Sequence, residues 1–138
     1  MSFEVDYRNA LLGYAPLAAL VGELVSERLD QETAYPAIRF ARVSTNRLYS
    51  MGGRNTMCVA RVQNDCWSPD VEESLDVADK LIQALDTFSL AEANPGSPAV
   101  YPQKPNFVIN QWTSNDPDAD PVIWRRIVEV RMYFIDSV

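Results

Sequence analysis

The chain has 138 residues, of which 47% are hydrophobic and 22% charged, and this composition excludes a disordered or fibrous protein. Its 12 Lys and Arg residues against 19 Asp and Glu give a formal net charge of -7, the wrong sign for coating nucleic acid. The absence of histidine excludes Ser-His-Asp and Cys-His catalytic sets and the usual zinc sites. We therefore expect a single domain over residues 1–138, with no catalytic site, metal or cofactor.

The start of the chain does not resemble a signal peptide, because Glu4, Asp6 and Arg8 interrupt it. No apolar run approaches the roughly 18 residues of a membrane span, so we expect no membrane partner and synthesis in a cytoplasm. Cys58 and Cys66 fall in one predicted strand, about 26 Å apart along it, which is too far for a disulfide. We expect both to be buried free thiols.

The first predicted element is a helix over Val5–Leu20, in one or two pieces. A break is expected where Gly13 precedes Pro16, and Gly22 ends the helix.

Two strands follow, over Ala37–Ser44 and Met57–Trp67, because β-branched and aromatic residues recur there. The segment Thr45–Thr56 between them is polar and contains glycines. It is too long for a tight hairpin, and we interpret it as a mobile projecting loop.

A capped amphipathic helix is predicted next, with Ser68 as the N-cap, Pro69 at the first helical position and acidic residues in the first turn. Its apolar stripe, spaced by three and four residues, faces the sheet. The stripe consists of Val71, Leu75, Ala78, Ile82 and Leu85, widened by Val77, Leu81 and Phe88.

A proline-rich surface connection is expected over Ala91–Pro105, followed by strands over Phe107–Trp112 and from Pro121 or Val122 to Ile135. The order is helix, strand, strand, helix, strand, strand. This order predicts an α+β fold, with a mostly antiparallel sheet of about four strands covered by two helices.

Arginines alternate with apolar residues on the predicted strands, so the sheet face away from the helices is expected to be polar. Two interpretations stay open: a solvated surface with cross-strand ion pairs, or a polar wall that contacts another subunit. The face is expected to contain Arg39, Arg42, Arg61, Gln63, Asp65, Arg125, Glu129 and Arg131, while Arg126 falls on the apolar side.

Two other binding motifs are present only in part. Asp116, Asp118 and Asp120 resemble the opening of a calcium loop, but neither the required Gly nor the bidentate Glu follows. Gly52 and Gly53 lack the Lys-Ser or Lys-Thr pair of a phosphate-binding loop.

Several segments of the chain, taken together, resemble the tail completion or tail terminator proteins of long-tailed bacteriophages and prophages. They are "AYPAIRF" from Ala34, "RLYSMGG", "ARVQNDCW" ending at Trp67, "ADKLIQAL", and "WRRIVEVRMYF" from Trp124 to Phe134. The resemblance implies a virion structural protein without enzymatic activity, located at the head-proximal end of the tail. It further implies a ring, commonly of six subunits, that caps the tail tube and attaches the capsid.

The partners implied by this resemblance are further copies of the chain, the tail tube protein and a head-completion or connector protein, with no sequence-specific nucleic acid. Loop length and charge then suggest an interface. Arg47, Tyr49 and Arg54 would reach a neighbouring subunit or the tube, and the acidic loop with Asp116, Asp118 and Asp120 would match such arginines on the next copy.

Two alternatives remain open from the sequence. One is a cytoplasmic α+β binding module or small enzyme, with a ligand between helix and sheet. The other is a head-to-tail connector or another minor tail protein, for which the same architecture would serve.

Overall fold

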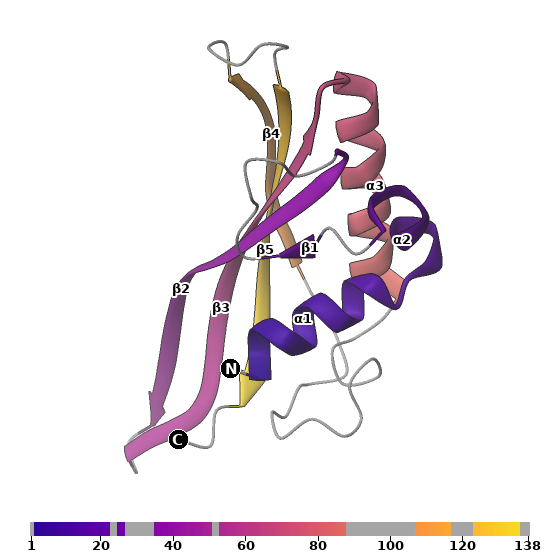
Figure 1. The fold of residues 1–138 in the computed structure, drawn as a ribbon. Helices are drawn as coiled ribbons and strands as arrows, with labels where there is room; N and C mark the ends of the chain where they lie inside the picture. Colours follow the sequence, from indigo (N-terminus) through magenta and orange to yellow (C-terminus); the bar gives the residue numbers. More distant parts are fainter. Residues whose placement is uncertain are drawn as a thin grey trace.

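The computed structural model describes residues 2–22, 25–26, 35–50, 53–87, 107–116 and 123–135. Its elements form one sheet with helices packed on one side of it (Figure 1). In chain order they are α1 (Ser2–Leu12), α2 (Ala15–Val21), β1 (Val25–Ser26), β2 (Ala37–Ser50), β3 (Gly53–Ser68), α3 (Val71–Thr87), β4 (Phe107–Asp116) and β5 (Ile123–Ile135).

The sheet has five strands in the order β1-β2-β3-β5-β4, and only the β1–β2 pair is parallel. The α+β class and the mostly antiparallel sheet are therefore confirmed. The N-terminal helix is in two pieces, with a break after Leu12, as Gly13 and Pro16 predict. Gly22 ends α2 with a φ of 62°, a conformation that glycine adopts without strain.

The sequence did not predict β1, because two residues are too short to show a pattern. Val25 and Ser26 pair with Ile38 and Arg39 of β2. The guanidinium of Arg8 in α1 donates from Nε to the carbonyl oxygen of Val25 at 2.7 Å, and the Val25 side chain is fully buried. This short strand therefore ties the helices to the edge of the sheet.

The predicted loop over Thr45–Thr56 is wrong. The β2–β3 ladder continues from Ala37 opposite Trp67 to Ser50 opposite Gly53, with register shifts after Arg42 and after Arg47. Thr45 and Asn46 of β2 are both exposed, and neighbouring strand residues point to opposite faces, so neither face of this edge strand is covered there, although Ala60 and Cys58 on β3 are buried. An edge strand that buries neither face at these positions lacks hydrophobic alternation there, which explains why its composition resembles that of a loop.

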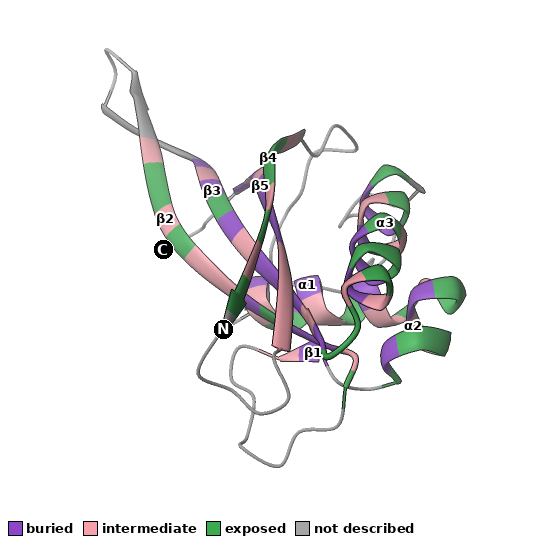
Figure 2. Cartoon of the chain, turned by 90° about the horizontal axis from the view of Figure 1, so that it is seen from above, coloured by how far each residue is buried: buried purple, intermediate pink, exposed green. Residues whose placement is uncertain are grey.

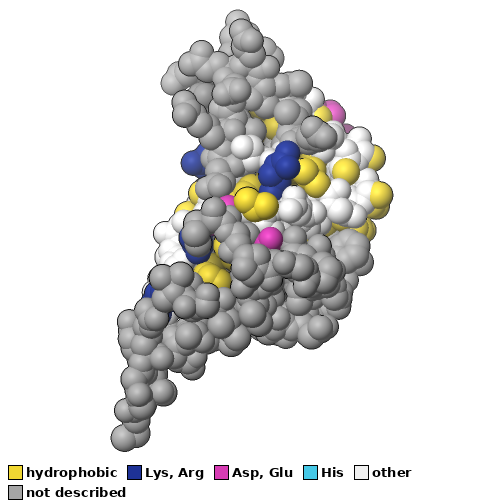
Figure 3. All heavy atoms as spheres, turned by 60° about the horizontal axis from the view of Figure 1, so that its bottom comes forward, with side chains coloured by type: hydrophobic (Ala, Val, Ile, Leu, Met, Phe, Trp, Pro, Cys, Tyr) yellow, Lys and Arg dark blue, Asp and Glu magenta, His cyan; other side chains and the backbone are white. Residues whose placement is uncertain are grey.

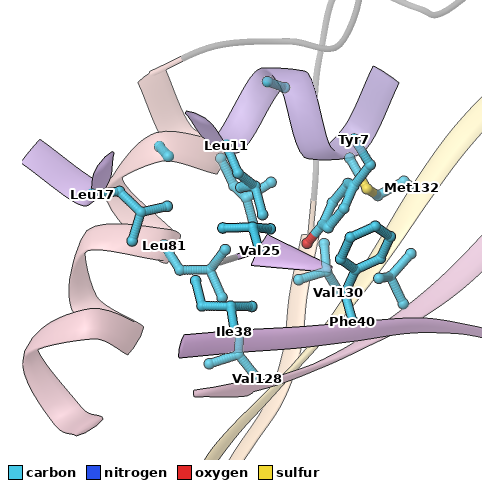
Figure 4. Packing of buried hydrophobic residues seen from close by; sticks show 14 of the residues in the cluster. Tyr7, Leu11, Leu17, Val25, Ile38, Phe40, Leu81, Val128, Val130 and Met132 are labelled. Carbon is cyan, nitrogen blue, oxygen red and sulfur yellow. The ribbon is translucent and has the colours of Figure 1, made fainter. Parts of the chain in front are cut away.

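The hydrophobic core lies between the helices and one face of the sheet (Figure 4). Tyr7 of α1 packs against Phe40 of β2 with ring centroids 5.0 Å apart, and its hydroxyl donates to Oδ1 of Asn64 at 2.7 Å. The side-chain amide of Asn64 donates in turn, from Nδ2, to the carbonyl oxygen of Val128. Because these buried polar groups have hydrogen-bond partners, they hold α1 over β3 and β5 at little cost in desolvation free energy.

The alternation predicted for the last strand is confirmed, since Val128, Val130, Met132 and Phe134 are buried in the core. Cys58 and Cys66 are buried and free, as expected. Burial raises the pKa of the Cys66 thiol far above its usual range, so this thiol stays protonated at neutral pH. The strand predicted over Phe107–Trp112 continues to Asp116.

The helix α3 begins two residues later than the sequence predicts. Ser68 is the last residue of β3, and the N-cap is Asp70, whose Oδ1 accepts from the Glu72 amide at 3.0 Å. The Ser68 hydroxyl instead accepts from the Asp70 amide and donates to Glu73. The ladder partner Trp124 holds Ser68 in the strand, so Pro69 belongs to the connection and not to the helix.

The buried side of α3 is also rotated from the predicted stripe. Ser74, Val77, Ala78, Leu81, Ala84 and Leu85 are buried, and Figure 2 shows this side turned toward the sheet. Leu75, which the sequence places in the stripe, is 37% exposed. Phe88 and the connection Ala91–Pro105 lie outside the described residues.

We predict that Leu81→Ala lowers the free energy of unfolding by about 2–5 kcal/mol, because it leaves a cavity between α3 and the sheet. Leu75→Ala, on the same helix, should cost about 0.5 kcal/mol or less. Urea unfolding followed by circular dichroism measures both values. Equal losses in the two variants would contradict the orientation of α3.

Candidate subunit interface

The predicted basic interface residues meet at the free end of the β2–β3 hairpin. Arg47 lies on β2 opposite Cys58, and Tyr49 is the ladder partner of Arg54. The strand β5 pairs with β3 only from Met57 onward, so Gly53–Thr56 continue beyond it. In Figure 1 this end of the hairpin extends past the rest of the sheet. The position is therefore suited to contact with another molecule, although it is a hairpin and not a loop.

The predicted acidic residues belong to the opposite end of the sheet. Asp116 is the last residue of β4, where it pairs with Ile123, while Asp118 and Asp120 lie outside the described residues. The 16 residues of β3 give a separation of about 50 Å between the two ends. The structure therefore does not bring Asp116 near Arg47, Tyr49 and Arg54 within one subunit.

Charge is segregated between these two ends of the sheet. From Ala41 to Asn64 the chain contains four arginines and no acidic residue, namely Arg42, Arg47, Arg54 and Arg61. From Pro105 to Trp124 it contains Asp116, Asp118 and Asp120 and no Lys or Arg. The segment around the β2–β3 turn is therefore basic and the β4–β5 turn is acidic, although Arg125 and Arg126 follow that turn on β5. In the view of Figure 3, which brings the bottom of Figure 1 forward, basic and acidic side chains both lie among hydrophobic ones.

The sheet face opposite the helices contains a cluster of paired charges, as the alternation of arginines predicts. The Asp65 carboxylate is only 2% exposed and lies 3.6 Å from the Arg39 guanidinium and 3.8 Å from that of Arg125. The Arg125 guanidinium also lies 5.1 Å from the centre of the Trp67 ring. A second ion pair joins Arg61 to Glu129. These contacts tie β2, β3 and β5 together through their side chains.

Arg42 and Arg126 contact residues outside this cluster of paired charges. Arg42 does not belong to this face, because it pairs with Glu4 of α1 at 2.9 Å and lies over the rings of Phe3 and Phe134. The sequence could not show this, since the partners come from α1 and β5. Arg126, on the helix side, donates to Thr113 and Gln111 of β4 beyond the core.

The described ranges hold no group of three or more His, Cys, Asp or Glu side chains that could bind a metal ion. Within the same ranges, no helix is both long and apolar enough to cross a membrane. The described geometry is that of an α+β domain in which ion pairs link the strands β2, β3 and β5.

The sequence matches the family described as Tail completion protein gp17 over residues 7–134, and the chain belongs to this family. It is therefore a phage tail completion protein of the structural kind, which confirms the resemblance and the prediction that it is not an enzyme.

A solved structure shows the same fold. A chain of the "Virion of native gene transfer agent (GTA) particle" superimposes with a TM-score of 0.74 at 13% identity, and the match covers 98% of this chain and 96% of the other. A search of curated protein sequences gives no match.

We predict that Asp65→Asn lowers the free energy of unfolding by about 1–3 kcal/mol, because both arginines lose their buried charged acceptor. The partners are themselves partly exposed, which limits the loss. Asp86→Asn on the exposed side of α3 is the matched control and should have little effect. Equal stability of the two variants in urea would show that the cluster is not structural.

Proposed function

We propose that the protein caps the head-proximal end of a phage tail tube as a ring of six subunits and offers the surface to which the capsid attaches. The observation that carries this proposal is the family match over residues 7–134. The shared fold with a chain of a virion particle supports it. The partners would be copies of the chain, the tube protein and a head-completion or connector protein, with residues 1–138 acting as a single unit.

A closed ring of identical subunits needs a head-to-tail interface, in which two different patches of each subunit meet. The two hairpins meet this requirement, because they lie at opposite ends of the sheet and differ in charge. The end that contains Arg47, Tyr49 and Arg54 would contact either the next subunit or the tube. The turn with Asp116, Asp118 and Asp120 would face the arginines of a neighbouring copy.

Electrostatics favours association only with a correctly oriented partner. The net charge of -7 makes free subunits repel one another, which opposes premature assembly. Opposite charges at the two hairpins lower this repulsion in the head-to-tail orientation alone. The interaction is therefore expected to weaken as ionic strength rises.

The decisive test is loss of the gene from its phage followed by complementation in trans. We predict that tails without the protein are overlong and lack heads in electron micrographs, and that the wild-type chain restores normal particles. Tails of normal length that merely lack heads would instead indicate a connector. Normal particles without the gene would contradict both roles.

Removal of the hairpin end tests its role directly. We predict that replacement of residues 46–55 by a short Gly-rich turn leaves the body folded, since β5 pairs with β3 only from Met57 onward. The variant should fail to restore attachment of heads to tails, with unchanged helical content by circular dichroism. Infectious particles from this variant would rule out a role for the hairpin end.

Charge reversal tests the pairing of the two ends. We predict that Arg47→Glu with Arg54→Glu lowers ring formation and head attachment about tenfold or more, with a dependence on salt concentration. Adding Asp118→Arg and Asp120→Arg to the same chain should recover part of the loss. Lys80→Glu on α3, which makes the same change of charge as either single Arg→Glu substitution, is the control for a charge reversal outside the hairpin end and should assemble normally. A deficit that does not change with salt would argue against a charged interface.

A further inference from the structure

The strand β4 lies at one edge of the sheet, where β5 is its neighbour on the inner side. In the described part of the chain no strand pairs with its outer side. Exposed residues occur on both faces of the strand, as Figure 2 shows, because α3 packs over β3 and β5. The exposed residues are Ile109, Asn110, Gln111, Thr113 and Asn115. The backbone donors and acceptors on the outer side are thus available to another strand.

The composition of β4 does not protect this edge. Soluble proteins usually block an exposed edge strand with Lys, Pro or other charged residues, or with a bulge. Here the ten residues "FVINQWTSND" contain neither Lys nor Pro, and the only charge is Asp116 at the end. A register shift leaves Ile109 out of the ladder, but Asn110–Asp116 pair with β5 without interruption. An unprotected edge of this length favours pairing with another chain.

The other open edge of the sheet belongs to β2. Within the described ranges β1 covers it only at Ile38 and Arg39. The successive antiparallel pairs β2–β3, β3–β5 and β5–β4 make β2 and β4 run in opposite directions. A β2 strand placed beside the β4 strand of a copy with the same orientation would therefore extend an antiparallel ladder.

The charges of the two edge strands also differ in sign. The strand β2 contains Arg39, Arg42 and Arg47 and no acidic residue, whereas β4 contains Asp116 and no basic one. Two β4 edges facing each other would bring acidic ends together, and two β2 edges would bring arginines together. Because Arg39 and Arg42 already form ion pairs with Asp65 and Glu4, charge gives the β2–β4 combination only a small preference over self-pairing.

We propose that β4 of one copy binds the outer edge of β2 of the next copy, so that the sheet continues from subunit to subunit. This inference rests on the proposed ring, and it assigns the contact that holds the ring together. Backbone hydrogen bonds supply the contact, and the common orientation of the copies in a ring makes β2 of one copy meet β4 of the next with antiparallel strand directions. Because the two edges differ, each subunit has one of each, which is the condition for a closed ring.

Cross-linking in assembled tails tests the pairing. Val43→Cys places a thiol on an exposed part of β2, and Ile109→Cys places one on β4, while the native thiols are buried. These two positions lie at the same level of the sheet, because the ladder runs from Arg42 through Val62 and Val130 to Val108. Tails complemented with a mixture of the two single variants, treated with a short bis-maleimide, should give a covalent dimer of the chain. Each variant alone should give none.

Every other result overturns the inference. A dimer from Ile109→Cys alone would mean that β4 pairs with itself, and a product with a different protein would mean that the tube or connector occupies the edge. Absence of any cross-linked product in the mixture would mean that the two edges do not meet.

A charge introduced on the β4 edge by substitution provides a second test of the pairing. Asn110→Lys places a cation on β4 level with Ala41 of the neighbouring β2, between Arg39 and Arg42, and should reduce head attachment about tenfold or more. Asn110→Asp, the matched control, should assemble as the wild-type chain does, and thermal unfolding confirms that both variants fold. Normal assembly of Asn110→Lys would overturn the inference.

The outcomes separate this inference from the proposed function. If the wild-type chain restores heads to tails but no β2–β4 cross-link forms, the edge pairing fails and the function stands. If the wild-type chain restores nothing, the proposed function itself fails.

Discussion

The hydrophobic core covers only the middle of the sheet, and this limit determines which parts of the strands stay exposed. Tyr7 and Leu81, from α1 and α3, are buried over the middle of the sheet, where β3 and β5 lie side by side (Figure 4). The strands continue past this covered region at the β2–β3 hairpin and at β4. The helices therefore stabilise the fold while leaving polar strand residues such as Thr45, Asn46 and Asn115 exposed.

Charged side chains extend this support toward both ends of the sheet. Arg42 links β2 to Glu4 of α1 where the hairpin leaves the core, and Asp65 joins β2 to β5 through two arginines. Such contacts restrict motion at the base of the hairpin without burying its end. A strand pair that is rigid at its base can place its end reproducibly against a partner, which lowers the entropic cost of association.

The candidate interface shows the limits of sequence reasoning most clearly. The sequence indicated the opposite charges of the candidate residues, because charge is visible without coordinates. It did not indicate that Tyr49 and Arg54 are ladder partners, or that Asp116 ends a strand at the far end of the sheet. Those positions depend on strand pairing between residues distant in the chain, and the polar composition of 45–56 shows no alternation from which to predict it.

The sequence by itself determined what depends on neighbouring residues and composition: the break after Leu12, the alternation of β5, the buried free cysteines and the absence of histidine chemistry. Only the tertiary structure decided which side of each element is buried and which residues contact one another, because these depend on the surfaces that pack together. It rotated α3 so that Leu81 is buried and Leu75 is not, and it turned Arg42 toward α1. Local periodicity fixes the type of an element, whereas its buried side is fixed by the shape of the surface that it packs against.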